Sequence, residues 1–443
     1  MSLEPDALTH LIFEASHTTF VRNKTSPIHR WFFYPEGFSG EFVELCIEKS
    51  GLQGEDVVLD PFVGSGTTLV SSKLKGIDSI GIDISPLMCF VSRMKTNLEI
   101  DTSSLRENLR SFTKRVEPIL LSTNRKSNLL SFTEGNSVVE ETHTPRLKVP
   151  SYPQMERYFS KSVMNQLLLL KENILNWKEE VSRDFLKLAF ASILVDVSNM
   201  KRMPDLTYSK LKKKPDVLLS FRNKVEEIYA DLRDLRSKPR VLGSSSVLLG
   251  NAKNIDRRMI DRDSINLIVT SPPYLGHGDY VKNTKIELWF LDFVTSEEEM
   301  KALRNNMIVA THRISKEKLR EKTTYSDQVL EDCCQKLAES PPSWFPDAHY
   351  MIRRFFDDMY RVFIQMYNVL KPEGCCVFVV GDSQFASIPV PTHIICSNIA
   401  TKVGFRSIEL KNVRRRRTGA ERKTKGGVNL NFELGEYILI GRK

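Results

Sequence analysis

Four consecutive residues, Ser271 to Tyr274, have the types and the order needed to handle a planar amino group. They follow an apolar stretch, Ile265 to Thr270, which we interpret as a buried strand. Because proline has no N–H and a fixed φ, Pro272 and Pro273 must end that strand in a rigid, extended turn. The carbonyl oxygens of this turn have no competing local donors, and an aromatic ring follows at Tyr274. A loop that merely ends a strand is the alternative interpretation.

A second motif, Asp60 to Thr68, lies far upstream and follows a short apolar run, Val57 to Leu59. Its two glycines, Gly64 and Gly66, allow the backbone to pass close to a ligand. A helix is expected to begin at the end of the motif, with its N-terminal N–H groups facing that ligand. No Gly-Lys-Ser/Thr follows, which disfavours a phosphate-binding P-loop.

An acidic residue stands at the end of the next predicted strand, Ser79 to Asp83. An acid about 20 residues beyond a glycine-rich turn is the usual acceptor for ribose hydroxyls. Asp83 could instead cap the helix that follows Ser85 and Pro86. Both motifs thus stand at the ends of strands, where open α/β sheets bind ligands.

The two motifs together resemble those of amino-group DNA methyltransferases. Ser-Pro-Pro-Tyr resembles the catalytic form associated with N4-cytosine methylation, and Asp60 to Thr68 resembles the family's S-adenosylmethionine loop. Asp83 with Ser85 and Pro86 resembles the second cofactor motif. The resemblance covers the first hundred residues and roughly residues 246–290 and 369–443, whereas the long middle segments match loosely.

The resemblance implies a set of site residues and S-adenosylmethionine as the cofactor. The catalytic residues would be Ser271, Pro272, Pro273 and Tyr274. The cofactor residues would be Tyr34, Asp60, Pro61, Phe62, Gly64, Gly66, Thr67, Thr68, Asp83 and Asn251. Asp60 would pair with the amino-acid end of the cofactor. Relatives commonly carry Asp at the position of Asn251, facing the adenine amino group, and an amide oxygen could keep that contact.

An aromatic and basic segment precedes the first strand and contains His29, Phe33 and Tyr34. In the family such a segment often closes over the methionine end of the cofactor. The alternative is an aromatic cluster that packs in the core.

The implied reaction is methyl transfer to the exocyclic N4 of cytosine in DNA. The amine is a poor nucleophile because its lone pair is delocalised into the ring. Ser271 and the carbonyl of Pro272 would accept its hydrogen bonds and draw the nitrogen toward tetrahedral geometry. Tyr274 would stack on the base after it flips out of the duplex. This chemistry needs neither a metal nor a covalent intermediate, and we expect no base role for His277.

Three alternatives stay open on the sequence. A DNA adenine N6-methyltransferase uses the same logic, although Asp or Asn usually replaces the serine. An RNA base methyltransferase would read the same amino group. An inactive methyltransferase-like scaffold would bind DNA without catalysis, but both motifs are intact.

The densest positive charge lies between the last two predicted strands, Ser407–Val413 and Glu436–Ile440. We expect phosphate contacts from it, which give affinity without reading sequence; a solvated face is the alternative. The residues are Arg414, Arg415, Arg416, Arg417, Arg422 and Lys423. Together with a net charge of +9, they favour duplex DNA as the partner. A cognate restriction endonuclease could accompany the enzyme.

The elements predict an α/β fold: a doubly wound, mostly parallel sheet. The resemblance implies the class I methyltransferase-like sheet of seven strands with an antiparallel last hairpin. We assign residues 24–98 and 246–443 to the catalytic domain, with the cofactor half in 24–98 and the catalytic half in 246–443. Residues 99–245 form a helical insertion that could contact DNA, including a polar linker, Ser122 to Thr144. Residues 296–350 form a second helical insertion.

Composition sets the remaining limits. No apolar run is long enough to span a membrane, and the first ten residues are polar and acidic, unlike a signal peptide. The seven cysteines lack metal-ligand spacing and are odd in number. We therefore expect core thiols in a reducing cytoplasm.

Overall fold

The computed structural model describes residues 8, 11–129, 144–150, 155–202, 205–210, 212, 215–237, 239–415 and 434–443, with side chains omitted for 123–129. Within these residues, seven strands form the central sheet in the order β10-β11-β7-β6-β1-β2-β5. Their bounds are β1 (Val57–Asp60), β2 (Asp78–Asp83), β5 (Ser245–Leu249), β6 (Ile265–Thr270), β7 (Leu370–Gly381), β10 (Arg406–Arg415) and β11 (Gly435–Arg442).

The winding of the sheet reverses between β1 and β6, and this reversal positions the site. The strands β5, β2, β1, β6 and β7 are parallel, whereas β11 is antiparallel to both of its neighbours. The chain runs outward from β1 through β2 to β5, and then returns to the other side of β1 at β6. A crevice forms at such a switch point, outside the carboxyl ends of the strands. The predicted fold class is confirmed.

Two layers of helices enclose the sheet. One face packs on α1 (Gly40–Lys49), whose first turn is capped by the Ser39 side chain, and α2 (Thr67–Leu74) and α3 (Pro86–Thr96) continue this layer. The other face packs on α13 (Ala348–Val369) and α14 (Thr392–Val403). The aromatic stripe of α13 is buried against the sheet, as its helical spacing predicts.

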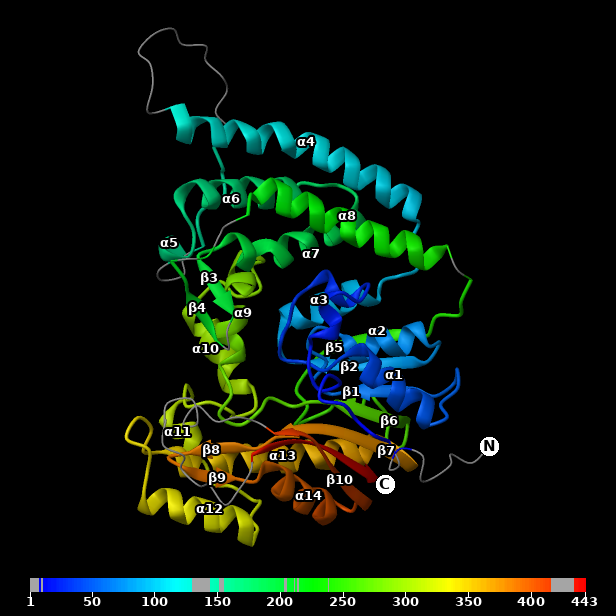
Figure 1. The fold of residues 1–443 in the computed structure, drawn as a ribbon, viewed down its shortest axis with the longest axis vertical. Helices are drawn as coiled ribbons and strands as arrows, with labels where there is room; N and C mark the ends of the chain where they lie inside the picture. Colours follow the sequence, from blue (N-terminus) through cyan, green and yellow to red (C-terminus); the bar gives the residue numbers. More distant parts are fainter. Residues whose placement is uncertain are drawn as a thin grey trace.

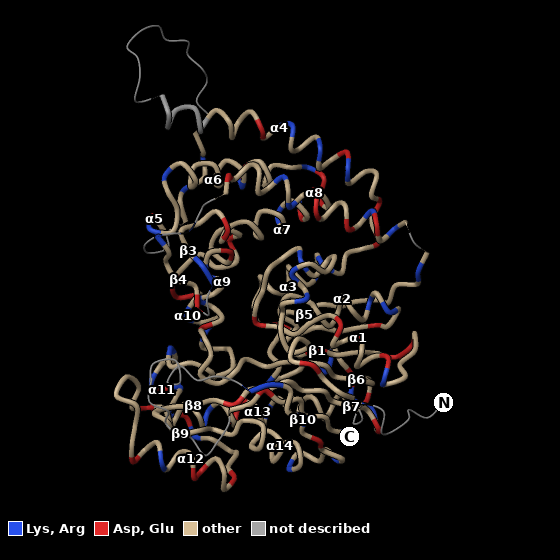
Figure 2. The backbone as a smooth tube through the Cα atoms, viewed as in Figure 1, with Lys and Arg blue, Asp and Glu red and all other residues tan. Residues whose placement is uncertain are grey.

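The helices of the 99–245 insertion form a bundle at the β5 end of the sheet, at the top of Figure 1. They are α4 (Thr102–Leu129), α5 (Met155–Tyr158), α6 (Lys161–Leu175), α7 (Glu180–Val197) and α8 (Val217–Arg236), with a small hairpin of β3 (Met200–Arg202) and β4 (Leu206–Tyr208). One continuous apolar cluster joins the bundle to α3 and α9. Both signs of charge occur along α4 and α8 (Figure 2).

The second insertion is helical, as the sequence predicts. The chain passes through α9 (Tyr280–Phe290) and α10 (Glu297–Asn306) to α11 (Lys316–Leu319) and α12 (Gln328–Glu339), which packs on α13 (Figure 1). The remaining elements are the 3-10 helices η1 (Arg22–Lys24) and η2 (His29–Trp31) and the hairpin of β8 (Ser383–Phe385) and β9 (Ile388–Val390).

One local expectation was wrong, and two further local features differ from what the sequence pattern suggests. The predicted linker begins inside α4, because the amphipathic pattern of that helix outweighs its Ser and Thr content as far as Leu129; residues 130–143 lie outside the described part. Residues 371–374 contain Pro372 and Gly374, which are typical of a turn, but they are part of β7, whose pairing with β6 shifts register there. The apolar pattern of α9 continues to Phe293, but the helix ends at Phe290, shortly before a left-handed residue at Asp292 (φ 57°).

Two further observations bear on composition. All seven cysteines are free and buried, consistent with core thiols. Among the described helices, none combines the length and the apolarity that crossing a membrane requires.

Candidate active site

Two adjoining cavities open at the carboxyl ends of the central strands. The first cavity has about 930 Å³ of empty space and the second about 960 Å³, mouths included. Six residues line both cavities: Glu36, Gly37, Phe38, Ser271, Pro272 and Tyr280. The predicted catalytic turn therefore lies where the two cavities meet.

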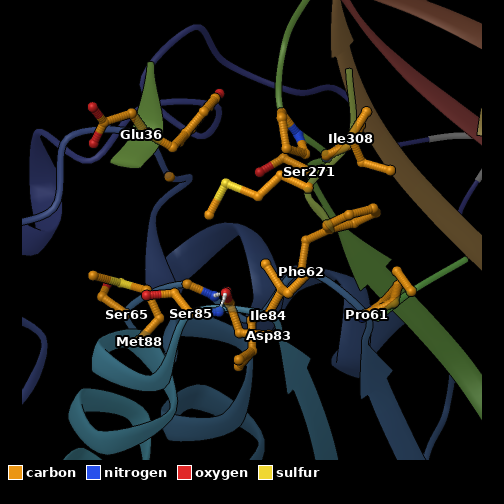
Figure 3. Close-up of a pocket in the computed structure, with 18 of the residues that line it drawn as sticks. Glu36, Pro61, Phe62, Ser65, Asp83, Ile84, Ser85, Met88, Ser271 and Ile308 are labelled. Carbon is orange, nitrogen blue, oxygen red and sulfur yellow. Dashed lines mark hydrogen bonds between the residues drawn. The ribbon is translucent and has the colours of Figure 1, made fainter. Parts of the chain in front are cut away.

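Most of the predicted cofactor residues line the first cavity. These are Tyr34, Pro61, Phe62, Gly64, Thr67, Asp83 and Asn251. Asp83 and Ser271 lie on opposite sides of it, with Phe62 between them (Figure 3). The cavity thus extends from the tip of β2 to the end of β6.

Gly64, in the turn after β1, contacts Asp83 at the tip of β2 through its backbone and lies against the Tyr34 ring. Its φ is 49°, and its N–H donates to Asp83 Oδ2 over 3.0 Å. A Cβ atom at this position would lie 3.3 Å from the Tyr34 ring. The glycine therefore permits both the left-handed turn and the close approach to Tyr34.

Asp83 is half-buried and has a carboxylate that the backbone orients. Besides the Gly64 bond, its Oδ1 accepts from the Ser85 N–H over 2.8 Å. Burial raises the pKa of Asp83 to about 6, against the lowering effect of these backbone donors. Asp83 thus bonds the start of α3 and still lines the first cavity, so the two interpretations of its role are compatible.

Asp60, Gly66 and Thr68 do not line the cavity. The Asp60 carboxylate is buried and accepts from the Phe62 N–H (3.0 Å), Thr68 Oγ1 (2.7 Å) and Thr270 Oγ1 (2.6 Å). Burial raises the pKa of Asp60 to about 6. Its expected pairing with the cofactor does not fit this geometry, because both carboxylate oxygens already join β1 to α2 and β6.

Gly66 packs between α2 and α3 and does not line the first cavity. It precedes α2 with φ 85°, and a Cβ atom would lie 3.1 Å from Ser92 Cα in α3. The glycine therefore lets α2 and α3 pack closely, which differs from the expected cofactor contact.

The catalytic turn distributes its residues between the cavities. Pro273 lines the first and Tyr274 the second, while Ser271 and Pro272 line both. The Tyr274 N–H donates to the Tyr280 hydroxyl at the start of α9 over 3.1 Å. His277 is exposed, and its ring lies 5.9 Å from that of Tyr274.

The aromatic residues of the segment before α1 are divided among the cavity wall, the surface and the core. Tyr34 belongs to the wall of the first cavity, whereas Phe33 is exposed beside Phe20. His29 is buried below α1, and burial lowers its pKa to about 3. His29 is therefore a neutral core residue.

Asn251 lies beyond the end of β5, which stops at Leu249. Its Nδ2 donates to the Asn306 carbonyl over 3.0 Å, and its Oδ1 accepts from the Lys253 N–H over 3.0 Å. An amide oxygen has two lone pairs, so the residue keeps acceptor capacity at the cavity wall.

Sequence reasoning missed the polar residues that complete the second cavity. Arg202 reaches it from β3 and donates to the Asn283 and Phe33 carbonyls, each over 3.2 Å. Glu36 accepts from Asn283 Nδ2 over 2.7 Å, and burial raises its pKa. Glu436 contributes from β11. No spacing signal links these residues, because they come from three distant segments.

The predicted DNA contacts divide into two groups. Arg414 is half-buried and its Nε donates to Glu436 Oε2 over 2.6 Å, so this guanidinium is an ion-pair partner inside the second cavity. Arg415 is exposed. Arg416, Arg417, Arg422 and Lys423 lie outside the described residues.

The part of the chain that the structure describes holds no cluster of three or more His, Cys, Asp or Glu suited to a metal.

Comparisons with known proteins agree with this geometry. The family model described as DNA methylase matches residues 12–94, which contain the glycine turn and Asp83. The Type II methyltransferase M.BsoBI of Geobacillus stearothermophilus is 27% identical over 91% of this chain and 84% of its own. M.AvaI of Nostoc sp. is 26% identical over 87% and 81%, and M.MvaI of Kocuria varians is 24% identical over 86% and 83%. The motifs, the sheet and these relatives agree, and over most of its length the chain is similar to DNA methyltransferases of the amino-group type.

Proposed function

We propose that the chain transfers a methyl group from S-adenosylmethionine to the N4 amino group of a cytosine that has flipped out of duplex DNA. The observation that carries this proposal is the position of Ser271 and Pro272, which line both cavities. One turn can then present the target amino group in the second cavity to a methyl donor in the first.

The residues of the first cavity fit the proposed methyl donor. Asp83 offers a carboxylate suited to ribose hydroxyls, and the Gly64 turn is a cradle that a side chain would fill. Asn251 provides an amide at the adenine end, and Tyr34 and Phe62 provide aromatic walls. When bound, S-adenosylmethionine supplies a sulfonium methyl that is open to nucleophilic attack.

The residues of the catalytic turn act on the amino group. Ser271 Oγ and the Pro272 carbonyl oxygen accept hydrogen bonds from the two N–H groups of the target amine. These bonds reduce the delocalisation of the nitrogen lone pair into the ring. The two prolines keep these acceptors rigid, so little conformational freedom is lost when the base binds. Tyr274, in the second cavity, provides a stacking surface for the flipped base. Most of the rate enhancement would come from this positioning.

Site-specific action on DNA is supported by the relatives, whose names describe Type II methyltransferases. A cognate restriction endonuclease is therefore the proposed cellular counterpart. The cytosine assignment is supported by the serine of the turn, since Asp or Asn usually stands there in adenine-specific members.

Nucleoside analysis of methylated product tests the proposal. Purified protein, S-adenosylmethionine and bacterial DNA are incubated, and the digested nucleosides are separated by mass spectrometry, with Ser271→Ala as the control. N4-methylcytosine in the wild-type reaction alone is the expected result. N6-methyladenine would reassign the base, methylation only of added RNA would reassign the nucleic acid, and cofactor binding without product would indicate an inactive scaffold.

A further inference from the structure

Glu436 is a buried carboxylate in the wall of the second cavity, 162 positions after Tyr274 in the chain. We propose that Glu436 is a positioning residue that fixes the Tyr274 ring for stacking on the target base. The proposal rests on the function proposed above and deepens it by assigning a residue outside the known motifs to the base-binding cavity.

Glu436 contacts the catalytic turn directly. The Tyr274 hydroxyl donates to Glu436 Oε1 over 3.1 Å. Because the Tyr274 N–H also donates to the Tyr280 hydroxyl over 3.1 Å, the residue is held at its backbone and at the far end of its ring. A tyrosine fixed at both ends presents one ring orientation to the cavity.

Two further residues hold the carboxylate in place. Arg414 donates to both oxygens, from Nε to Oε2 over 2.6 Å and from Nη2 to Oε1 over 3.3 Å. The Thr18 hydroxyl also donates to Oε2. A buried carboxylate is costly unless it is paired and hydrogen-bonded, and these donors meet that requirement. All four side chains line the second cavity.

The sheet explains why Arg414 faces this cavity. Arg414 and Glu436 are direct cross-strand partners on β10 and β11, and the pairing register shifts between Asn412 and Arg414. A bulge of this kind redirects a side chain. The first arginine of the basic segment is thus part of the base-binding cavity, whereas Arg415 is exposed.

A purely structural ion pair is the competing explanation, in which Glu436 and Arg414 only join the N-terminal segment to β10 and β11. The two explanations differ at the tyrosine hydroxyl. A structural pair does not need that hydroxyl, whereas a positioning residue acts through it.

The experiment is a double-mutant cycle with Tyr274→Phe, Glu436→Gln and the double variant, and with Glu409→Gln on β10 as the matched control. Glu409 is a partly exposed carboxylate paired with Lys411 on the same strand. Three quantities are measured: single-turnover methylation rate, cofactor affinity, and the fluorescence of 2-aminopurine placed at the target base, which reports flipping and stacking without turnover.

We expect each single variant to lower the methylation rate by about tenfold, the usual size of one hydrogen bond to a charged group. The double variant should be no slower than the slower single variant, since Tyr274→Phe removes and Glu436→Gln weakens the same contact. The 2-aminopurine signal should change in all three, while cofactor affinity and the Glu409→Gln control stay at the wild-type level.

Additive losses in the double variant would overturn the proposal, as would a Tyr274→Phe protein with wild-type rate and fluorescence. Because Tyr274→Phe removes one hydroxyl and keeps the ring, it tests the idea even if Glu436→Gln fails to fold. A wild-type protein that methylates no nucleic acid would instead refute the proposed function.

Discussion

At the scale of single residues, Asp60 and Asp83 differ in their surroundings, although burial raises the pKa of each carboxyl to about 6. Asp60 is enclosed by three donors, whereas Asp83 receives two backbone bonds and still lines the first cavity. In the sequence, each aspartate ends a predicted strand within a cofactor motif, so the motifs alone predict the same role for both. The difference arises from two threonines, Thr68 and Thr270, of which the second lies more than 200 positions away in sequence and could not be connected to Asp60 before the fold was known.

The first expected outcome concerns Asp83→Ala. Loss of the charged acceptor should weaken S-adenosylmethionine binding by roughly 1.5–3 kcal/mol, or roughly tenfold to a hundredfold. Isothermal titration calorimetry measures the affinity, and circular dichroism verifies the fold. Unchanged affinity in a folded variant would remove Asp83 from the cofactor site.

A second outcome is the pH dependence of cofactor binding. Burial raises the pKa of Asp83 to about 6 in the free protein, and hydroxyl donors from a ligand would favour the charged form and lower it again. Affinity should therefore be full above pH 6 and decline as pH falls through 6, by at most about tenfold per pH unit. Titrations between pH 5 and 8 measure this, and Asp83→Asn should flatten the profile. An equally steep profile in Asp83→Asn would assign the titration elsewhere.

The third outcome concerns Ser271, which lines both cavities. Ser271→Ala should lower single-turnover methylation by at least about fivefold, the size of one neutral hydrogen bond, with cofactor affinity near normal. Ser271→Asp should retain some activity and shift preference toward adenine. Measured rates on cytosine and adenine targets decide both points, and a wild-type rate in Ser271→Ala would contradict the hydrogen-bonding role.

At the scale of elements, local signals predicted most of the sheet and its turns. The apolar runs before Asp60 and before Ser271 became β1 and β6, and helix α2 begins at Thr67 as expected. What could not be predicted were contacts between elements: Arg202 of β3 entering the second cavity, and Arg414 pairing with Glu436 across β10 and β11. The sequence reveals the positive charge of the arginine run. It does not reveal that Glu436 lies opposite Arg414, because that contact depends on the pairing of β10 with β11.

The Arg414–Glu436 ion pair changes the choice of residues for the fourth prediction, which concerns the basic segment that begins at the end of β10. Arg414 is used inside the molecule, so Arg415, Arg416 and Arg417 are the residues to change to Ser for phosphate binding. Each arginine that no longer neutralises a phosphate should reduce the slope of log affinity against log salt by about 0.9 on duplex DNA, alike for all sequences. Fluorescence anisotropy at several salt concentrations measures the slope. An unchanged slope would make these arginines a solvated face.

At the scale of the whole molecule, the insertion shares one apolar core with helices that cover the sheet, namely α2, α3 and α9. Trp31 lies 6.0 Å from Phe185 of α7, and Phe190 of α7 lies 6.0 Å from Phe290 of α9. These rings belong to the cluster that also contains Val91 and Met94 of α3. The predicted division at residues 99–245 therefore marks a change in local pattern, while the apolar core continues across it.

The fifth outcome follows from that shared core. If the bundle and the sheet unfold together, S-adenosylmethionine bound beside β1 and β2 should also protect α6, which does not line the first cavity. At a concentration 100 times its Kd, a ligand stabilises the native state by about 2.7 kcal/mol. Global hydrogen exchange in α6 and in β6 should then slow by the same factor, roughly a hundredfold. Exchange mass spectrometry with and without cofactor measures both elements, and Asp83→Ala at the same concentration is the control. Protection confined to β6, with α6 exchanging as in the free protein, would show that the insertion opens independently of the catalytic sheet.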